Sequence, residues 1–364
     1  VFLKDETKLV HGHCGPKMER LDVRTVNPAI QRGSTYLYDS IDHLREAKAK
    51  AVDLGIASYG IGGGDITLHF QEAFCAIENG FRGVAVNSGL LACTLPLMAL
   101  LQHGDHLLMV DTVYGPVRTF CDGYLPRIGV TVTYYDPLAT IDELDALTTD
   151  RTRVIYLETP GSLTFEMQDI PAIAAWAQDR SIRTIIDNTW ATGLYFKPLD
   201  HGIDISTHAA TKYMCGHSDV ISGAIVCNKD TALAVEQTRD QLGLAMPPDE
   251  AYLGLRGLRT MAVRLPVHWQ NGLKLASYLA GREEVSNVLH PAMEQDPGYA
   301  LWSRDFSGAS GLFSVVMRSD ISWEQLNGFL GALKLYGLGY SWGGFESLCV
   351  LQSPKTVRTG SHWP

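Results

Sequence analysis

Two residues of this chain have side chains suited to covalent catalysis, an acid at Asp187 and an amine at Lys212. Asp187 ends the apolar run Thr184–Ile186, which has the pattern of a buried strand, and Lys212 is flanked by small and apolar residues. An amine in such surroundings has a lowered pKa and is a better nucleophile. It could form a Schiff base with pyridoxal phosphate, whose ring nitrogen the acid would keep protonated. Taken singly, an acid at a strand end is more often a turn or capping residue, and a lysine is more often a solvated surface group.

A glycine-containing turn could hold the phosphate of such a cofactor. Gly83–Asn87 is a predicted buried strand, and Ser88, Gly89 and Leu90 open the helix that follows it. Backbone N–H groups at the start of a helix bind phosphate, and glycine allows the close approach. A strand–Ser-Gly–helix connection is common, so it is the presence of Lys212 downstream that indicates a phosphate site here.

The sequence around Lys212 resembles the active site of the Cys/Met-metabolism pyridoxal-phosphate enzymes, the family of the cystathionine lyases and synthases. The resemblance rests on Ala209–Tyr213 (AATKY) and Gly216–Asp219 (GHSD), which are most similar to the bacterial cystathionine β-lyases. It covers almost the whole chain, from Asn27–Arg32 to Tyr340–Gly344. It implies a type I aminotransferase-like α/β fold with pyridoxal phosphate on Lys212. It also implies a cytoplasmic lyase of trans-sulfuration and methionine biosynthesis that converts L-cystathionine by α,β-elimination to homocysteine, pyruvate and ammonia.

The same resemblance assigns roles to individual residues. Lys212, Tyr114 and Asp187 would be catalytic, with the Tyr114 ring stacked on the cofactor, although a tyrosine in this position is by itself more often a capping aromatic. Tyr59 would reach the phosphate in an adjacent subunit. The expected cofactor-binding residues are Ser88, Gly89, Leu90, Tyr114, Asp187, Thr211, Lys212 and Tyr59. The expected substrate-binding residues are Tyr340, Ser341 and Trp342, the last two near the α-carboxylate.

Departures from the family pattern leave other activities open. The family has an arginine where this chain has Ile61, and the β-lyases often have a second where it has Gly62. Their loss weakens phosphate anchoring and leaves room for a β-lyase of smaller S-substituted cysteines, or for a non-catalytic relative. Elimination or replacement at the γ-carbon, as in cystathionine γ-lyase, cystathionine γ-synthase or methionine γ-lyase, uses the same residues.

Strands and helices alternate from residue 83 onward, which predicts a mainly parallel sheet covered on both faces. Ligands of such sheets bind at the carboxyl ends of the strands, where Ser88, Tyr114, Glu158 and Asp187 fall. The family implies seven strands. Six are predicted at Gly83–Asn87, His106–Val110, Val130–Tyr134, Arg153–Leu157, Arg183–Asp187 and Ser222–Cys227. Helices are predicted at Ile41–Leu54, Asp65–Glu78 (with Asp65 as a possible N-cap), Ile141–Leu147, Ile170–Gln178, and from Gly254 to Leu279.

Three parts of the chain are expected: an arm over residues 1–57, a cofactor-binding domain over 58–250, and a smaller α+β domain over 251–364. The family continues with a strand that carries Leu-Arg-x-His-x-Gly, whose arginine binds the α-carboxylate. The sequence stops at Pro364, and Arg358 comes too early to match this arginine. We therefore expect either that the smaller domain is truncated or that this chain holds the α-carboxylate with a weaker contact.

Composition narrows the function classes. The chain has 364 residues and a net charge of −10 without basic runs, which argues against nucleic acid as a partner. No apolar stretch is long enough for a membrane span, and Val1–Glu6 does not have the pattern of a signal peptide. The seven cysteines have the pattern of reduced thiols. No metal site is expected, and the segment that comes nearest to metal-ligand spacing is His11–Cys14. The expected partners are a small sulfur amino acid and further copies of the chain, forming a dimer at least and by analogy a tetramer.

Overall fold

The computed structural model describes residues 4–11, 14–18, 20–54 and 59–363. Three predictions lie wholly or partly outside these residues: those on the start of the chain, on the His11–Cys14 segment, and on the arm boundary between residues 57 and 58. Among the described residues, none of the helices combines the length and the apolar character that crossing a membrane requires.

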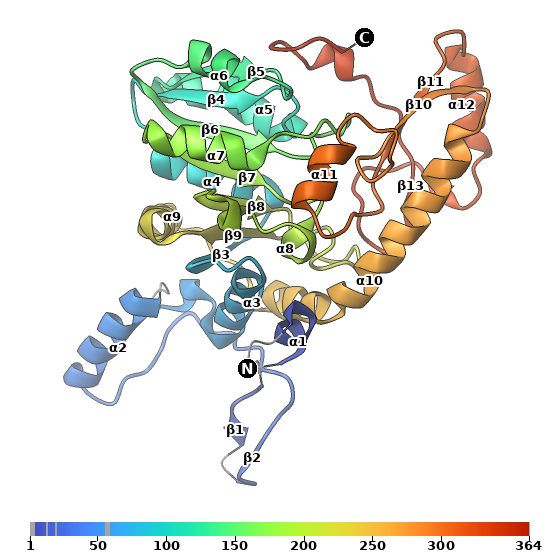
Figure 1. Cartoon of the computed structure of the whole chain (residues 1–364). Helices are drawn as coiled ribbons and strands as arrows, with labels where there is room; N and C mark the ends of the chain where they lie inside the picture. Colours follow the sequence, from blue (N-terminus) through green and yellow to red (C-terminus); the bar gives the residue numbers. More distant parts are fainter. Residues whose placement is uncertain (1–3, 12–13, 19, 55–58, 364) are drawn as a thin grey trace.

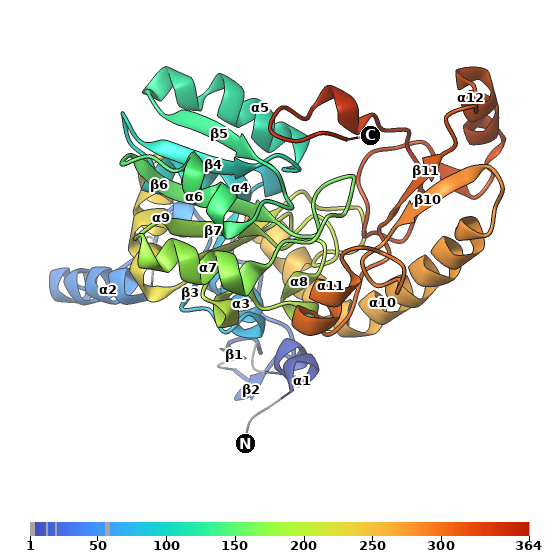
Figure 2. The same cartoon turned by 45° about the horizontal axis from the view of Figure 1, so that its top comes forward.

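A seven-stranded, mainly parallel sheet forms the centre of the molecule (Figures 1 and 2). Its strand order is β3-β9-β8-β7-β6-β4-β5, and β9 alone runs antiparallel to its neighbours. The predicted fold class is therefore confirmed. The strands are β3 (Arg82–Val86), β4 (His106–Val110), β5 (Thr131–Tyr135), β6 (Thr152–Glu158), β7 (Arg183–Asp187), β8 (Ile205–His208) and β9 (Gly223–Cys227).

Helices lie on both sides of this sheet (Figures 1 and 2) because its strands are apolar on both faces. Short helical turns connect several of the elements. The helices are α3 (Gly64–Ile77), α4 (Gly89–Leu100), α5 (Gly115–Gly123), α6 (Ile141–Leu147), α7 (Ile170–Asp179), α8 (Thr192–Tyr195) and α9 (Lys229–Gln241). The short turns are η2 (Leu125–Ile128) and η3 (Pro198–His201).

The N-terminal elements lie outside this sandwich. In Figure 1, α2 and the hairpin of β1 and β2 project away from the sheet, while α1 packs against α3 and α10. Leu37, before α2, is 93% exposed, so this part of the chain lacks a core of its own. The elements are α1 (Asp5–Val10), β1 (Lys17–Met18), β2 (Val23–Arg24), α2 (Ile41–Leu54) and η1 (Gly60–Gly62).

The long helix α10 (Pro248–Ala280) connects the central sheet to the C-terminal elements (Figure 1). Its first half packs against α3, and its second half packs against β10. The remaining elements are β10 (Val285–Leu289), α11 (Tyr299–Asp305), β11 (Ser314–Met317), α12 (Trp323–Ala332), β12 (Tyr336–Gly337), β13 (Ser347–Leu348) and η4 (Pro354–Thr356).

Several local predictions were wrong. The seventh strand, β8, had not been located, because its sequence Ile205–His208 has only one strongly apolar residue. Helix α3 is capped by Gly63 in the left-handed conformation, so Asp65 lies in the first turn and is not the N-cap. The predicted six strand ranges agree with the structure to within one residue.

Candidate active site

The sheet brings most of the predicted site residues to one edge. Glu158 and Asp187 are paired at the carboxyl ends of the parallel strands β6 and β7. Tyr114 follows the end of β4, and Ser88 follows the end of β3. These strands run in the same direction, so their carboxyl ends meet at a single edge, where ligands of α/β sheets bind.

Asp187 is a buried acid whose two oxygens have unequal partners. The side chain is 9% exposed. Its Oδ1 accepts hydrogen bonds from the backbone N–H of Thr189 at 2.9 Å and from the Thr189 hydroxyl at 2.5 Å. Its Oδ2 is 3.4 Å from the Cys93 thiol, a weak donor. Oδ2 is therefore the oxygen that retains the capacity to bind a cationic partner.

Lys212 is held beside this acid in a turn between β8 and β9. Its Nζ donates to Ser341 Oγ at 2.7 Å and lies 5.3 Å from the Trp342 ring centroid. Burial lowers the pKa of Lys212, and the negative charges of Asp187 and Glu346 oppose that effect. The amine is thus a stronger nucleophile than a surface lysine while it remains within the field of Asp187.

The Ser341–Gly343 loop packs directly on the backbone of this lysine. Ser341 has a φ of 95° and Gly343 a φ of 85°. A Cβ atom at Gly343 would lie 2.9 Å from Tyr213 N and 3.2 Å from Lys212 Cα. A positive φ at a residue other than glycine is costly and is common at functional sites. The Trp342 ring lies 5.3 Å from that of Tyr213, whereas the Tyr340 side chain is 84% exposed.

The start of α4 has the geometry of an anion site. Ser88 caps the helix by accepting the Leu91 N–H at 3.2 Å, and the first N–H groups of a helix have no intrahelical acceptor. A Cβ atom at Gly89 would lie 2.4 Å from that of Ala209, so glycine is what lets this turn approach the lysine segment. Leu90 is 39% exposed, and the turn is thus open to a ligand.

The Thr211 hydroxyl has hydrogen-bond partners within the chain. It donates to Ser222 O at 3.1 Å and accepts from Ser222 N at 2.9 Å. It fastens the lysine turn to the segment before β9, so that a phosphate contact would have to share an oxygen that is already engaged. Its role as a phosphate ligand remains a prediction.

Glu158 was not assigned a role from the sequence, although its place at a strand end was noted. Its Oε2 accepts the Tyr114 N–H at 2.8 Å, which fixes the backbone that carries this ring. Burial, followed by the charge of Asp187, raises the pKa of Glu158 well above its ordinary value. Burial likewise raises the pKa of Tyr114, with further contributions from Cys93, Asp187 and Glu158.

The sequence did not predict that Thr189 and Cys93 belong to the site. Thr189 could have been found from its position two residues after an acid at a strand end, where a hydroxyl readily bonds to the carboxylate. Cys93 carried no signal beyond its apolar surroundings. Tyr59, before η1, is 56% exposed, as a residue that serves a neighbouring subunit would be in a single chain. Ile61 lies within η1.

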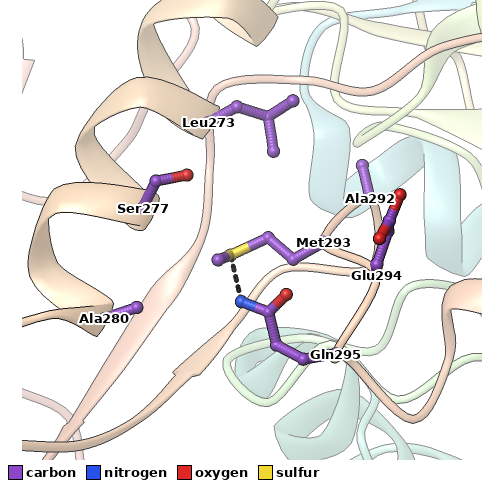
Figure 3. A pocket seen from close by; sticks show the side chains of 7 residues that line it. All are labelled: Leu273, Ser277, Ala280, Ala292, Met293, Glu294 and Gln295. Atoms are coloured by element: carbon purple, nitrogen blue, oxygen red, sulfur yellow. Dashed lines mark hydrogen bonds between the residues drawn. The ribbon is translucent and has the colours of Figure 1, made fainter.

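These residues fit pyridoxal phosphate. A buried carboxylate oxygen with only a weak donor suits a protonated ring nitrogen, a desolvated lysine suits the aldehyde, and a capped helix start suits the phosphate. A hollow elsewhere, between α10 and the loop after β10, contains none of them (Figure 3). Its lining residues are Leu273, Ser277, Ala280, Ala292, Met293, Glu294 and Gln295.

The chain is similar to known pyridoxal-phosphate enzymes over most of its length. The family described as Cys/Met metabolism PLP-dependent enzyme matches residues 6–361. The chain is 45% identical to a Rhizobium johnstonii protein provisionally named cystathionine beta-lyase, over 89% of this chain and 81% of that protein. It is 39% identical to cystathionine beta-lyase MetC of Escherichia coli, over 97% of this chain and 89% of that protein. The crystal structure of cystathionine gamma-lyase from Lactobacillus plantarum superposes with a TM-score of 0.85 at 29% identity, covering 95% of this chain and 86% of that one.

Proposed function

The chain belongs to the Cys/Met-metabolism family of pyridoxal-phosphate-dependent enzymes, and we propose that it is a carbon–sulfur lyase that converts L-cystathionine by α,β-elimination to homocysteine, pyruvate and ammonia. The observation that carries the proposal is the pairing of a buried acid with a desolvated lysine at the carboxyl edge of the sheet. Relatives named cystathionine beta-lyase, 39% and 45% identical to this chain, support the choice of reaction within the family.

Each residue of the site has a separate role in such a reaction. Pyridoxal phosphate, when bound, supplies an electron sink for the bond that breaks at the α-carbon of the substrate. Asp187 keeps a proton on the ring nitrogen through Oδ2, since Thr189 occupies Oδ1. The Lys212 amine takes the α-proton of the substrate, and it returns a proton to the departing sulfur. Ser341 and Trp342, which lie against Lys212, orient the α-carboxylate.

The product of L-cystathionine tests this assignment. Cleavage at the β-carbon releases pyruvate, whereas cleavage at the γ-carbon releases 2-oxobutyrate, and chromatography of the 2-oxo acid distinguishes them. Release of 2-oxobutyrate would show that the protein catalyses γ-elimination. Turnover of small S-substituted cysteines in place of cystathionine would assign it to that substrate class.

Replacement of the lysine tests whether the chain is catalytic. We expect Lys212→Ala to lower turnover by about 10³-fold or more, because both proton transfers use this amine. Lys229→Ala is the matched control, since Lys229 is an exposed lysine at the start of α9. A Lys212→Ala variant as active as Lys229→Ala would exclude the mechanism.

We also propose that the active unit is a dimer at least, with Tyr59 serving the neighbouring site, and that the enzyme works as a tetramer in the cytoplasm. Exposed apolar residues of the arm, such as Leu37, support association, and the seven unpaired cysteines suit a reducing compartment. Light scattering of the eluting protein measures the assembly. A monomer with full activity would contradict the role of Tyr59.

A further inference from the structure

The two oxygens of Asp187 are held by donors of different strength. Two donors from Thr189 hold Oδ1, at 2.9 Å and 2.5 Å. The Cys93 thiol, 3.4 Å away, is the donor that faces Oδ2. Hydrogen bonds to a carboxylate lower its basicity, and an S–H donor does so much less than an O–H or N–H donor. The thiol can therefore fix the direction of Oδ2 while leaving that oxygen basic.

Cys93 reaches Asp187 from the helix that also forms the anion site. Gly89 and Cys93 are four residues apart on α4, so they share one face of the helix. Gly89 packs on Ala209 beside the lysine turn, and Cys93 contacts the acid. One face of α4 thus sets the separation between the phosphate turn and the acid.

The surroundings of Cys93 keep its thiol protonated. The side chain is 1% exposed, and the Thr207 hydroxyl lies 3.8 Å from its sulfur on the side of β8. Burial, followed by the charge of Asp187, raises the pKa of Cys93 well above its ordinary value. The S–H proton is therefore retained, and Asp187 Oδ2 lies within hydrogen-bond distance to accept it. The other titratable groups around the pair are Lys212, Glu158, Tyr114 and Tyr156.

We propose that Cys93 is a positioning residue, which donates its S–H to Asp187 Oδ2 and so orients the oxygen that holds the proton of the cofactor ring nitrogen, at a much smaller loss of basicity than an O–H or N–H donor would cause. The inference rests on the assignment of Asp187 to the cofactor ring. It does not depend on which thioether the enzyme cleaves.

Infrared spectroscopy of the cofactor-free protein tests the hydrogen bond itself. The difference spectrum between the wild type and Cys93→Ala isolates the S–H stretching band of Cys93. We expect that band at the lowered frequency of a thiol bonded to a carboxylate, and we expect Asp187→Asn to shift it towards the frequency of an unbonded thiol. A band unaffected by Asp187→Asn would overturn the proposal.

Titration of the bound cofactor tests the consequence for the site. Cys93→Ser places a stronger donor on Oδ2 and weakens its hold on the ring proton, whereas Cys93→Ala removes the donor. The midpoint pH of the visible-band titration should therefore shift in opposite directions in the two variants, and the dissociation constant for pyridoxal phosphate should rise by about 2- to 10-fold in Cys93→Ser. Shifts of the same sign, or none, would mean that Cys93 only fills space.

Cys121 provides the matched control. It is also fully buried, on α5, and its replacement by serine or alanine imposes the same burial and cavity costs away from Asp187. We expect Cys121→Ser to lower thermal stability without moving the visible-band titration. The outcomes are separable from those of the proposed function, because the spectra and the infrared band report on Asp187 while the product assay reports on the substrate. A wild-type protein that binds no pyridoxal phosphate at saturation would overturn the inference.

Discussion

The reactivity of Lys212 is a balance between burial and charge. Burial disfavours the ammonium form, while Asp187 and Glu346 favour it, and the net effect is a pKa below the ordinary value. Ser341 Oγ accepts a hydrogen bond from Lys212 Nζ at 2.7 Å, and this bond holds the amine near the acid. The site thus combines a nucleophile with a neighbouring negative charge, which a fully exposed lysine would lack.

This balance predicts the pH at which the cofactor-free protein reacts with aldehydes. A folded-state pKa below that of a free lysine means that the neutral amine of Lys212 is present at lower pH than that of an exposed lysine. We expect reductive labelling with pyridoxal, which has no phosphate, to modify Lys212 ahead of Lys229 between pH 7 and 9, where ordinary lysines with a pKa of about 10.4 are protonated. Peptide mass spectrometry after borohydride reduction measures both sites in the same sample. Equal labelling of the two lysines at each pH would show that burial does not activate Lys212.

The close approach of α4 to the lysine turn depends on one glycine. A Cβ atom at Gly89 would lie 2.4 Å from Ala209 Cβ and 2.7 Å from Ala209 Cα, which is backbone and cannot move alone. We expect Gly89→Ala to push the start of α4 away from the lysine turn and to weaken the binding of pyridoxal phosphate by about 10-fold or more, through the geometry of the phosphate contacts. Fluorescence titration of the cofactor measures the dissociation constant.

Gly115→Ala is the control for this substitution. Gly115 is also the first residue of its helix, α5, but a Cβ atom there has no neighbour within 4 Å. It therefore changes helix propensity equally without the steric conflict. Equal cofactor affinities in the two variants would argue against the close approach at Gly89.

The elements were predictable where apolar runs are bounded by turn residues. His106–Val110 and Arg183–Asp187 are fully or largely buried, and their apolar sequences are typical of central parallel strands. The sequence does not predict β8, because Ile205–His208 is buried by its position between β7 and β9 and not by its own hydrophobicity. Long-range packing likewise decides the Thr211–Ser222 and Cys93–Asp187 contacts, which no local pattern could reveal.

The site was predictable to the extent that it lies in contiguous motifs. Lys212 and Asp187 could be identified because each belongs to a short recognisable segment, and the resemblance added Ser341 and Trp342, which the structure places against Lys212. Tyr340, in the same segment, is 84% exposed. Sequence proximity thus identifies the loop, whereas the backbone conformation at Ser341 decides which side chains face the lysine.

A buried acid joins the C-terminal segment to the central sheet. Asp111, after β4, accepts hydrogen bonds from the N–H groups of Thr359, Gly360 and Ser361, the last at 2.7 Å. Arg118 of α5 contacts both Asp111 and Thr359. In Figure 2 this segment lies beside α5. The C-terminal segment is thereby connected to the central sheet at the edge where the site lies.

This connection predicts that the attachment of the C-terminal segment to the sheet depends on pH. Burial alone would raise the pKa of Asp111, but the hydrogen bonds from Ser361, Thr359 and Gly360 and the charge of Arg118 outweigh it and lower the pKa below its ordinary value. A depressed folded-state pKa gives a stabilisation that is complete above the unfolded value, about 3.9, and that is lost as the pH falls through the folded value. The docked segment should therefore stay in place at neutral pH and detach in acid.

Amide hydrogen exchange measures this docking. With correction for the intrinsic pH dependence of exchange, we expect residues 357–363 to be protected at pH 7 in the wild type. We expect that protection to be lost in acid, as the pH falls below the unfolded value of about 3.9 and through the lowered folded-state pKa of Asp111. Asp111→Asn should reduce protection of the same peptide by about 10-fold or more at pH 7, because the amide cannot replace a carboxylate that accepts several donors beside a buried guanidinium. Asp150→Asn, at an exposed aspartate, should leave it unchanged. Protection that persists in Asp111→Asn would mean that other contacts, such as the ion pair of Arg358 and Glu166 at 2.7 Å, suffice to hold the segment on the sheet.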